Sequence, residues 1–325
     1  MKIIFVGDDA ASPTSPLKTW ASGFERQKVE CTFPDPYAIS IREWVAIIKS
    51  ANALIYQGYG VTDPFMFRQL AIASAMGCPI VRKWSGSDIY YALKSKKIER
   101  SVLQLNKIIS HNFTSEHIGI CQELGSLGIE CKLLPQIIDA VNFPHLNRTS
   151  ISKGVLVYLP HKRYEFYGLQ YIERLVEDFQ DVTFYIVADE LHRLAHFKNV
   201  RSLGWVSEME PVWELVGLVV RITEHDGYPR TVLEALARGK YVVHNRAFDG
   251  CWFASNYEDI RQCIVDFKQI KSINDKGLET AKQLLSGKSD LELVQAIKSV
   301  CLSKKKRLLA ILFTFKFLVY IKMKN

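Results

Sequence analysis

Short apolar runs, each followed by a helical stretch, recur along most of this 325-residue chain and constrain its fold more than any other feature. The first half carries such runs at 2–7, 53–58, 78–84, 107–110 and 131–135. The second half carries them at 154–160, 182–188, 199–205, 217–223 and 240–244. Strands that alternate with helices form parallel sheets, and helices cover both faces of such sheets. The two series therefore predict an α/β protein with two doubly wound domains.

A stretch rich in Asn, Pro, Ser and Thr at 139–153 separates the two series and predicts the join between the domains. We expect an N-terminal lobe over 1–148, a C-terminal lobe over 149–300 and a separate tail over 301–325. The length agrees, because domains of about 150 residues are common. Ligands of open α/β sheets bind beyond the carboxyl ends of the strands, so we expect the lobes to face each other across a cleft.

Composition narrows the class of protein and its compartment. The seven cysteines are scattered and form no CxxC pair, which favours reduced thiols in the cytoplasm over a zinc site or a disulfide framework. The opening MKIIFVGDD has one short apolar run before two acids, which predicts a strand and not a signal peptide. The sequence has no Asp-x-Asp motif of the kind that holds a metal ion.

The basic charge of the chain belongs to its tail. Residues 301–325 carry seven basic side chains and no acid, and removing those seven from the total of +8 leaves +1 for 1–300. A nearly neutral body does not fit a nucleic-acid binder, which spreads Lys and Arg over a folded face. The apolar part of the tail, 308–321, is shorter than the roughly 20 residues that span a bilayer. We expect a basic amphipathic helix on an anionic membrane surface; the alternative is a final helix packed on a lobe.

One turn, EHDGYPR at 224–230, combines features that suit an anion. It lies between an apolar run and a helical stretch, and the free N–H groups and positive dipole end of a helix favour an anion. Gly227 lets the backbone approach a phosphate, and Pro229 suits the first helical turn. Arg221 and Arg230 can add charge-assisted hydrogen bonds to phosphate oxygens.

Two acids eight residues apart, Asp226 and Glu234, flank this turn. Carboxylates accept hydrogen bonds from paired hydroxyls, so Glu234 suits a ribose diol and Asp226 suits another polyol. An anion site beside two such carboxylates predicts a nucleotide-sugar site. The alternative is that Asp226 is a helix N-cap and Glu234 a solvated side chain.

The order of these residues resembles the donor-site signature of retaining GT-B glycosyltransferases of the family-4 type, also called glycosyl transferases group 1. The matching residues are Asp226-Gly227-Tyr228, then Glu234-Ala235-Leu236, then Gly239 and the Val-Val pair that follows, with Asp where the family usually has Glu. Segments 82–89, 133–143 and 198–217 extend the resemblance over about 80–300. It implies a GT-B fold of two Rossmann-like lobes and an enzyme of the hexosyltransferase type that retains anomeric configuration without metal.

The resemblance implies a role for each matching position. Asp226 would hold hydroxyls of the donor sugar and Glu234 the ribose. The arginines would neutralise the leaving diphosphate in place of a metal ion. Ser207 and the pair Ala188–Asp189 would lie near the base. The candidate catalytic residues are Asp226, Arg221, Arg230 and Asp88. The candidate donor-binding residues are Lys162, Arg163, Val206, Gly227, Tyr228, Pro229, Thr231 and Glu234.

The chain departs from the family at two positions. Tyr167 stands before Gly168, where the family commonly has Lys, and Ser85 stands where a His is frequent. Asp88, three residues after Ser85, could bind an acceptor hydroxyl or cap the helix that follows. Asp8 or Asp9, after the first strand, could also contact the acceptor.

These features and the resemblance predict transfer of a sugar from a UDP- or GDP-linked donor to a saccharide acceptor in bacterial surface polysaccharide biosynthesis. The basic tail, which suits a membrane surface, favours a lipid-linked acceptor. No further cofactor is expected. The predicted location is the cytoplasm, peripheral at the inner face of the cell membrane. Two alternatives stay open: a non-catalytic GT-B-like accessory subunit, and a sugar-nucleotide epimerase.

Overall fold

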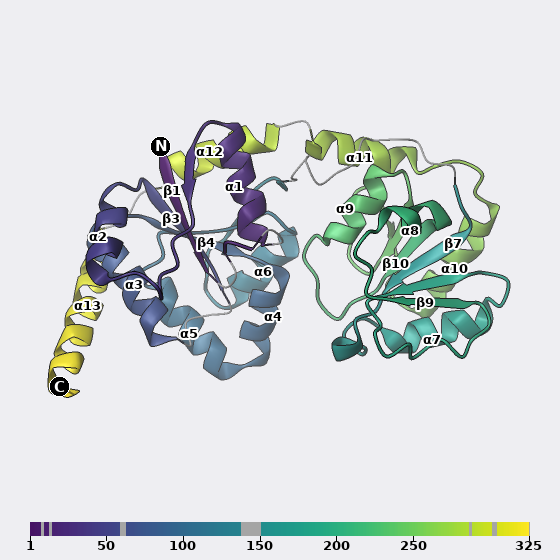
Figure 1. Ribbon diagram of the computed structural model, residues 1–325, viewed down its shortest axis with the longest axis horizontal. Coiled ribbons are helices and arrows are strands. Elements are labelled where there is room, and N and C mark those ends of the chain that lie inside the picture. The colour runs from purple at the N-terminus through teal and green to yellow at the C-terminus, as the bar shows by residue number, and fades with distance from the viewer. Residues whose placement is uncertain are drawn as a thin grey trace. The chain divides into compact units, whose positions relative to one another are not determined.

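The computed structural model describes residues 1–7, 10–12, 15–58, 63–137, 151–285, 288–300 and 304–324, with the side chains of the last helix described as far as Thr314. The chain divides into two compact units, each described here by itself (Figure 1). The first unit comprises Met1–Asp139 and Ser286–Asn325, and the second comprises Ala140–Leu285. Asp8, Asp9 and most of the predicted join at 139–153 lie outside the described residues.

The first unit contains a six-stranded parallel sheet in the order β2-β1-β3-β4-β5-β6. Its strands are β1 (Lys2–Gly7), β2 (Glu30–Thr32), β3 (Ala53–Gln57), β4 (Ile80–Trp84), β5 (His111–Thr114) and β6 (Lys132–Leu133). Side chains of β1 alternate between the two faces: Ile3 and Phe5 enter one apolar cluster, and Ile4 and Val6 enter another. Burial on both faces explains why these strands are continuous apolar runs.

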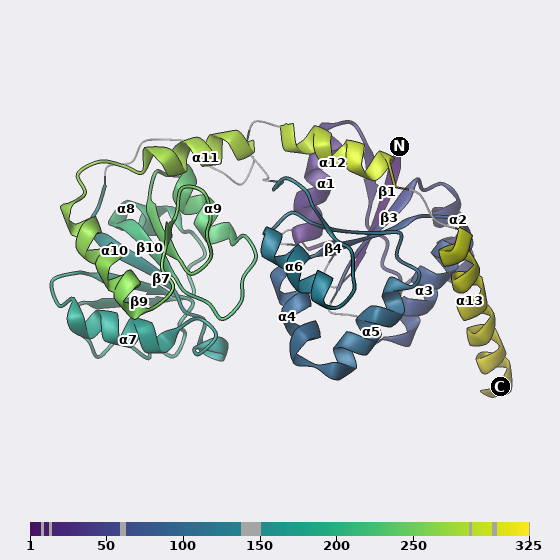
Figure 2. The same cartoon turned by 180° about the vertical axis from the view of Figure 1, so that it is seen from behind.

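Helices cover both faces of this sheet (Figures 1 and 2). On one face lie α1 (Pro16–Arg26) and α12 (Lys288–Lys298). The other face is covered by α2 (Ile41–Lys49) and α3 (Pro64–Ala75). A further cluster joins α4 (Gly86–Lys94), α5 (Lys96–Asn106) and α6 (Ile118–Ser126) around Trp84.

Helix α12 belongs to the first unit, whereas the sequence pattern predicted it in the second lobe. The carboxylate of Asp290 on α12 accepts two hydrogen bonds from Arg26 on α1, at 2.6 Å from Nε and 2.9 Å from Nη2. Leu293 and Ile297 are buried in the same cluster as α1. The expected end of the second lobe at residue 300 therefore differs from the observed division, because the apolar face of α12 packs on the first sheet's helical layer.

The last helix, α13 (Lys304–Lys324), packs on α3 (Figure 2). Ala310 is fully buried, and the ring of Phe313 meets that of Phe67 edge-on at 5.5 Å. Lys306 donates to the carbonyl of Ile109, and Arg307 Nε donates to that of Ala75 at 3.2 Å. Over its described side chains the tail is thus a helix docked on the first unit. None of the described helices carries an apolar stretch long enough for a membrane crossing.

The second unit repeats the architecture with a parallel sheet in the order β12-β11-β10-β7-β8-β9. Its strands are β7 (Gly154–Tyr158), β8 (Phe184–Val187), β9 (Val200–Gly204), β10 (Val216–Arg221), β11 (Tyr241–His244) and β12 (Trp252–Phe253). Its order places β10 beside β7 at the centre of the sheet, so the segments after these two strands leave the sheet next to each other.

Helices again cover both faces of this second sheet. On one face α7 (Leu169–Asp178) and α10 (Tyr257–Gln269) pack together on the strands. On the other face lie α8 (Glu210–Leu215), α9 (Arg230–Ala237) and α11 (Asp275–Leu285). A short 3-10 helix, η2 (His161–Arg163), follows β7.

Most predicted strands are present, and the exceptions have a physical reason. The run 107–110 is not a strand: it follows α5, and β5 begins at His111. The run is buried because Ile108 and Ile109 pack under α13, not because they pair in the sheet. Strands β2 and β12 were not predicted, because they are edge strands of two or three residues without an apolar run.

Lys240, just before β11, offers a test of the second unit's packing. Its side chain is fully buried, and its ammonium has no hydrogen-bond partner in the described parts of the chain. Burial lowers its pKa, and the nearby Arg238 lowers it further. We predict that Lys240→Met raises the free energy of unfolding by about 1–3 kcal/mol at pH 7, because it removes a buried unpaired charge.

The control is Lys276→Met, which removes an exposed lysine of α11. Because the folded-state pKa of Lys240 lies below the unfolded-state value, the wild type gains stability as pH rises toward about 10.4, and the advantage of Lys240→Met should shrink. Urea denaturation at several pH values measures this. A less stable Lys240→Met protein at pH 7 would contradict it.

Candidate functional site

The turn singled out in the sequence lies at the carboxyl edge of the second sheet, between the last residue of β10, Arg221, and the first of α9, Arg230. Two neighbours hold it. The N–H of Glu224 donates to the carbonyl of Phe166 at 2.8 Å, which ties the turn to the segment after β7. Asn245, after β11, donates to the carbonyl of Thr223 at 2.6 Å and accepts from its N–H at 3.3 Å. The turn is therefore fixed by the segments that leave both neighbouring strands.

Asp226 and Arg221 form an ion pair inside this turn. Arg221 Nε and Nη2 each lie 2.8 Å from Asp226 Oδ2. The Arg221 side chain is 9% exposed, and its guanidinium lies over the rings of Tyr158 and Tyr167. Nε2 of the buried His244 lies 4.0 Å from the same carboxylate oxygen. Asp226 thus has a fixed orientation, and its other oxygen, Oδ1, accepts the N–H of Gly227 at 3.0 Å.

Arg230 and Glu234 form a second ion pair, one turn apart on α9. Arg230 Nε lies 2.7 Å from Glu234 Oε1, and the Arg230 side chain is 55% exposed against 18% for Glu234. Because the arginine of this pair is largely in water, the pair stabilises the protein little. Both acids and both arginines predicted for the site are therefore brought together, but as two separate pairs that differ in burial.

The remaining donor-site residues of the turn lie close by. Pro229 is the N-cap residue, one position before the first helical turn in which it was expected. Tyr228 packs against Phe248, with ring centroids 4.4 Å apart, and burial raises its pKa. Tyr228 and Val206, which follows β9, pack on the same apolar cluster. Gly227 is buried, and Thr231 is half-buried on the first turn of α9.

The basic residues after β7 lie in η2. Lys162 is exposed, and the guanidinium of Arg163 stacks on Phe166 at 3.8 Å. Because Phe166 also accepts the N–H of Glu224, η2 and the Asp226 turn share one anchoring residue. The structure thus places these cations at the same sheet edge as the turn.

The residues predicted to lie near the nucleotide base differ in their surroundings. Asp189 is fully buried and accepts hydrogen bonds from Tyr164 Oη at 2.5 Å and Arg193 N at 2.7 Å, so its carboxylate is occupied by the protein. Ser207 is exposed. Trp205, which directly follows β9, is 72% exposed and was not among the predicted site residues; a tryptophan directly after a strand-ending Gly is the signal that could have indicated it.

In the first unit, Asp88 is buried on the first turn of α4. Its Oδ2 accepts the N–H of Ser85 at 3.1 Å, the helix-capping alternative of the two left open. Burial raises the pKa of Asp88 to about 7, and the nearby Arg82 opposes that rise. The structure thus gives Asp88 a capping role, and contact with an acceptor stays a prediction.

Ser85, where the family often has His, is the centre of a polar network that the sequence did not indicate. Its hydroxyl oxygen lies 2.8 Å from Gln57 Nε2 and 3.1 Å from Lys83 Nζ. Lys83 is almost fully buried, and its ammonium lies 3.7 Å from Glu116 Oε1. These side chains come from the carboxyl ends of β3, β4 and β5 or just beyond, so only the sheet brings them together.

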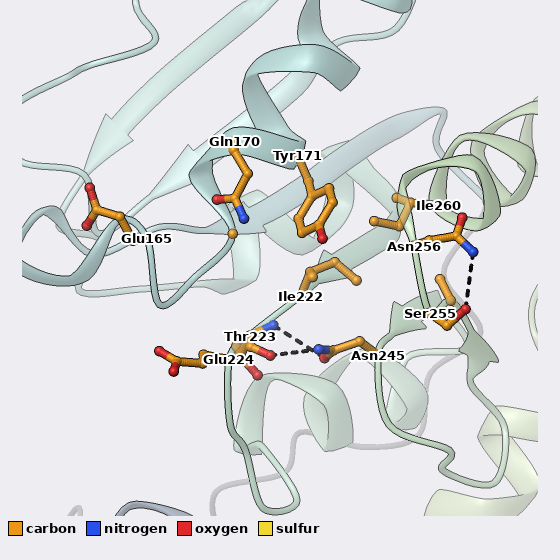
Figure 3. Close-up of a pocket in the computed structure, with 12 residues that line it drawn as sticks. Glu165, Gln170, Tyr171, Ile222, Thr223, Glu224, Asn245, Ser255, Asn256 and Ile260 are labelled. Atoms are coloured by element: carbon orange, nitrogen blue, oxygen red, sulfur yellow. Dashed lines mark hydrogen bonds between the residues drawn. The ribbon is translucent and has the colours of Figure 1, made fainter. Parts of the chain in front are cut away.

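A cavity of about 360 Å³ opens on the other side of the turn, between α7 and α10 (Figure 3). Thr223 and Glu224 form one wall, and Gln170 and Tyr171 form another. None of the predicted donor-site residues lines it. No group of three or more His, Cys, Asp or Glu residues able to hold a metal occurs in the described part of the chain; metal independence stays a prediction.

No family model and no curated protein matches the sequence of this chain. Solved structures do match. HepE from Anabaena, solved with UDP and glucose, has a TM-score of 0.61 at 16% identity, over 92% of this chain and 100% of HepE. The lipopolysaccharide outer core galactosyltransferase WaaB has a TM-score of 0.60 at 13% identity, over 91% of this chain and 99% of WaaB.

TarM from S. aureus, solved with fondaparinux, α-GlcNAc-glycerol and UDP, has a TM-score of 0.57 at 14% identity, over 77% of this chain. This chain spans 56% of the length of that TarM chain. The fold is GT-B. Two parallel six-stranded sheets with flanking helices, matched over nearly the whole chain, establish this architecture, and identities of this size establish nothing finer.

The Arg221–Asp226 pair predicts a measurable coupling within the GT-B second lobe. Arg221→Met and Asp226→Asn should each lower the free energy of unfolding. Each removes one charge of the pair and leaves the partly buried charge of the other side chain unpaired. In a double-mutant cycle by urea denaturation, we expect a coupling of about 1–3 kcal/mol. The matched control is the pair whose arginine is exposed, Arg230→Met with Glu234→Gln, for which we expect roughly 0.5 kcal/mol or less. Additive effects at Arg221 and Asp226 would show that the pair is not coupled.

Proposed function

We propose that this protein is a glycosyltransferase that moves a hexose from a UDP- or GDP-linked donor to a saccharide acceptor, with retention of anomeric configuration. The observation that carries the proposal is the turn after β10, which presents Asp226 and Glu234 beside two arginines and the start of α9. The GT-B neighbours solved with UDP support a nucleotide-sugar as donor.

In this proposal the second unit binds the donor. Glu234 accepts hydrogen bonds from the ribose hydroxyls, and Arg230, exposed and weakly paired, turns to the diphosphate. Lys162 and Arg163 add positive charge from the segment after β7, and the N–H groups at the start of α9 meet the same anion. Arg221 acts through Asp226, whose carboxylate it orients toward hydroxyls of the donor sugar.

The reaction then needs no side-chain nucleophile. The bond from the anomeric carbon to the diphosphate oxygen breaks, and a bond to the acceptor oxygen forms on the same face. The acceptor proton passes to an oxygen of the leaving phosphate, whose negative charge Arg230, Arg163 and Lys162 stabilise in place of a metal ion. We place the acceptor in the first unit, where Lys83, Ser85 and Gln57 form a polar network at the carboxyl edge of the sheet.

A thermal-shift experiment tests the donor site. Purified protein is heated with UDP, GDP and their common sugar conjugates, without metal. We expect one nucleotide family to raise the melting temperature, since a ligand at 100 times its Kd stabilises by about 2.7 kcal/mol. Glu234→Ala should raise the Kd of that nucleotide roughly 10- to 150-fold, because hydrogen bonds worth about 1.5–3 kcal/mol are lost.

The control is Glu279→Ala, an exposed glutamate of α11 in the same unit. It should leave nucleotide binding unchanged. Product analysis of the donor alone, with and without an acceptor, separates transfer from epimerisation. Nucleotide affinity that is equal in wild type and Glu234→Ala would remove the ribose assignment, and no shift with any nucleotide would favour the non-catalytic alternative.

We further propose that the protein works at the inner face of the bacterial cell membrane on a lipid-linked acceptor, in surface polysaccharide biosynthesis. Helix α13 docks on α3 by one side and exposes three large apolar side chains, Leu308, Ile311 and Leu312, on the other. Lys304 and Lys305 at its start are exposed, and 301–325 contains no acid. Apolar side chains beside lysines suit an anionic lipid surface.

Cosedimentation with vesicles tests this contact. We expect the protein to bind phosphatidylglycerol-rich vesicles and not phosphatidylcholine vesicles, and salt should weaken the binding. Combining Leu308→Ser, Ile311→Ser and Leu312→Ser should reduce partition at least about tenfold, because less apolar surface leaves water. The control, Leu291→Ser, changes an equally exposed leucine of α12. A triple variant that binds vesicles like the wild type would rule out α13 as the contact.

A further inference from the structure

The cavity between α7 and α10 is formed wholly within the second unit, by the segments that follow four strands of its sheet. Gly168 and the first turn of α7 follow β7, and Ile222 to Glu224 follow β10. Asn245 follows β11, and Ser255 and Asn256 follow β12 and cap α10. At about 360 Å³ it is near the small end of ligand pockets and suits a ligand of one or two rings.

The side chains that line this cavity differ in charge from the donor site. Its lining contains two carboxylates, Glu165 and Glu224, and neither Lys nor Arg occurs among the described residues around it. An anion such as a nucleotide or a phosphate would meet repulsion there. The lining thus favours a neutral ligand with hydroxyl groups that donate to carboxylates.

Three polar groups of the cavity are available to such a ligand. The side chains of Glu165, Gln170 and Tyr171 make no hydrogen bond within the described part of the chain. Figure 3 shows Gln170 and Tyr171 side by side, with the ring of Tyr171 facing Ile222 and Ile260 across the cavity. A carboxylate, an amide and the phenol ring of a tyrosine are groups that bind sugars by hydrogen bonds and ring contact.

The backbone keeps this space open at Gly168. Gly168 has a φ of +69°, in the left-handed region that favours glycine. A Cβ there would lie 3.1 Å from the carbonyl oxygen of Ile222 and 3.3 Å from Cδ2 of Tyr171. The close approach of α7 to the end of β10 therefore depends on this glycine. The missing Cβ also leaves room for the ring of Tyr171.

From these observations we infer that the cavity is a second carbohydrate site, which binds a neutral mono- or disaccharide through Tyr171, Gln170 and Glu165. It is separate from the donor site, since it shares none of the proposed donor-binding residues. The two are adjacent, because Thr223 and Glu224 line the cavity and belong to the turn that holds Asp226. The inference holds whether or not the protein transfers a sugar.

Saturation-transfer NMR on the full chain tests the inference, with glucose, galactose, N-acetylglucosamine, maltose and lactose as probes. We expect at least one saccharide to receive magnetisation. Gln170→Ala and Tyr171→Ala should each weaken its binding about fivefold or more, as expected for the loss of a hydrogen bond or a ring contact. Gln170 is exposed, so its variant should fold even where Tyr171→Ala does not.

The matched control is Gln262→Ala, an exposed glutamine of α10 outside the cavity. It should bind the saccharide like the wild type, and the thermal shift with nucleotide should be the same in all variants. No transfer to any probe, or equal binding by wild type and Gln170→Ala, would overturn the inference. If a saccharide binds but no nucleotide raises the melting temperature, the proposed transferase function is refuted and the second carbohydrate site is retained.

Discussion

Both units depend on one constraint: a sheet whose strands are all parallel must have helices on both faces. The backbone groups of β1 and β10 are paired within the sheets, and their side chains are buried in turn on either face. Parallel pairing also requires each connection to cross over the sheet, so every strand ends at the same edge. That edge is where side chains far apart in sequence meet, and it is where each candidate site of this protein lies.

The burial of charge separates residues that fix the site from residues that can meet a ligand. Arg221, enclosed by two tyrosines, holds Asp226 in one orientation. Arg230 and Glu234 are paired in more open surroundings, so a diphosphate and a ribose could replace that pairing at little cost. The same types of residue thus have two roles, which depend on how exposed the arginine of each pair is to water.

The end of the chain adds to the first unit instead of the second. The Asp290–Arg26 pair and the apolar side of α12 complete the helical layer on one face, and α13 extends the layer on the other. The first half of α13 is therefore both a packed helix and an exposed apolar surface. The two alternatives drawn from the tail's sequence need not exclude each other, because a helix has two sides.

The sequence by itself determined the fold class and the position of the principal turn. Continuous apolar runs that alternate with helical stretches favour parallel strands buried between helices, and Gly, Pro and charged residues after such a run mark the turn at 224–230. The tertiary structure alone decided which charges pair, that Asp88 is buried as a cap, that Ser85 joins Gln57 and Lys83, and that a cavity lined by two glutamates lies behind the turn. Strand order sets these contacts, and strand order depends on packing between distant segments that no local pattern records.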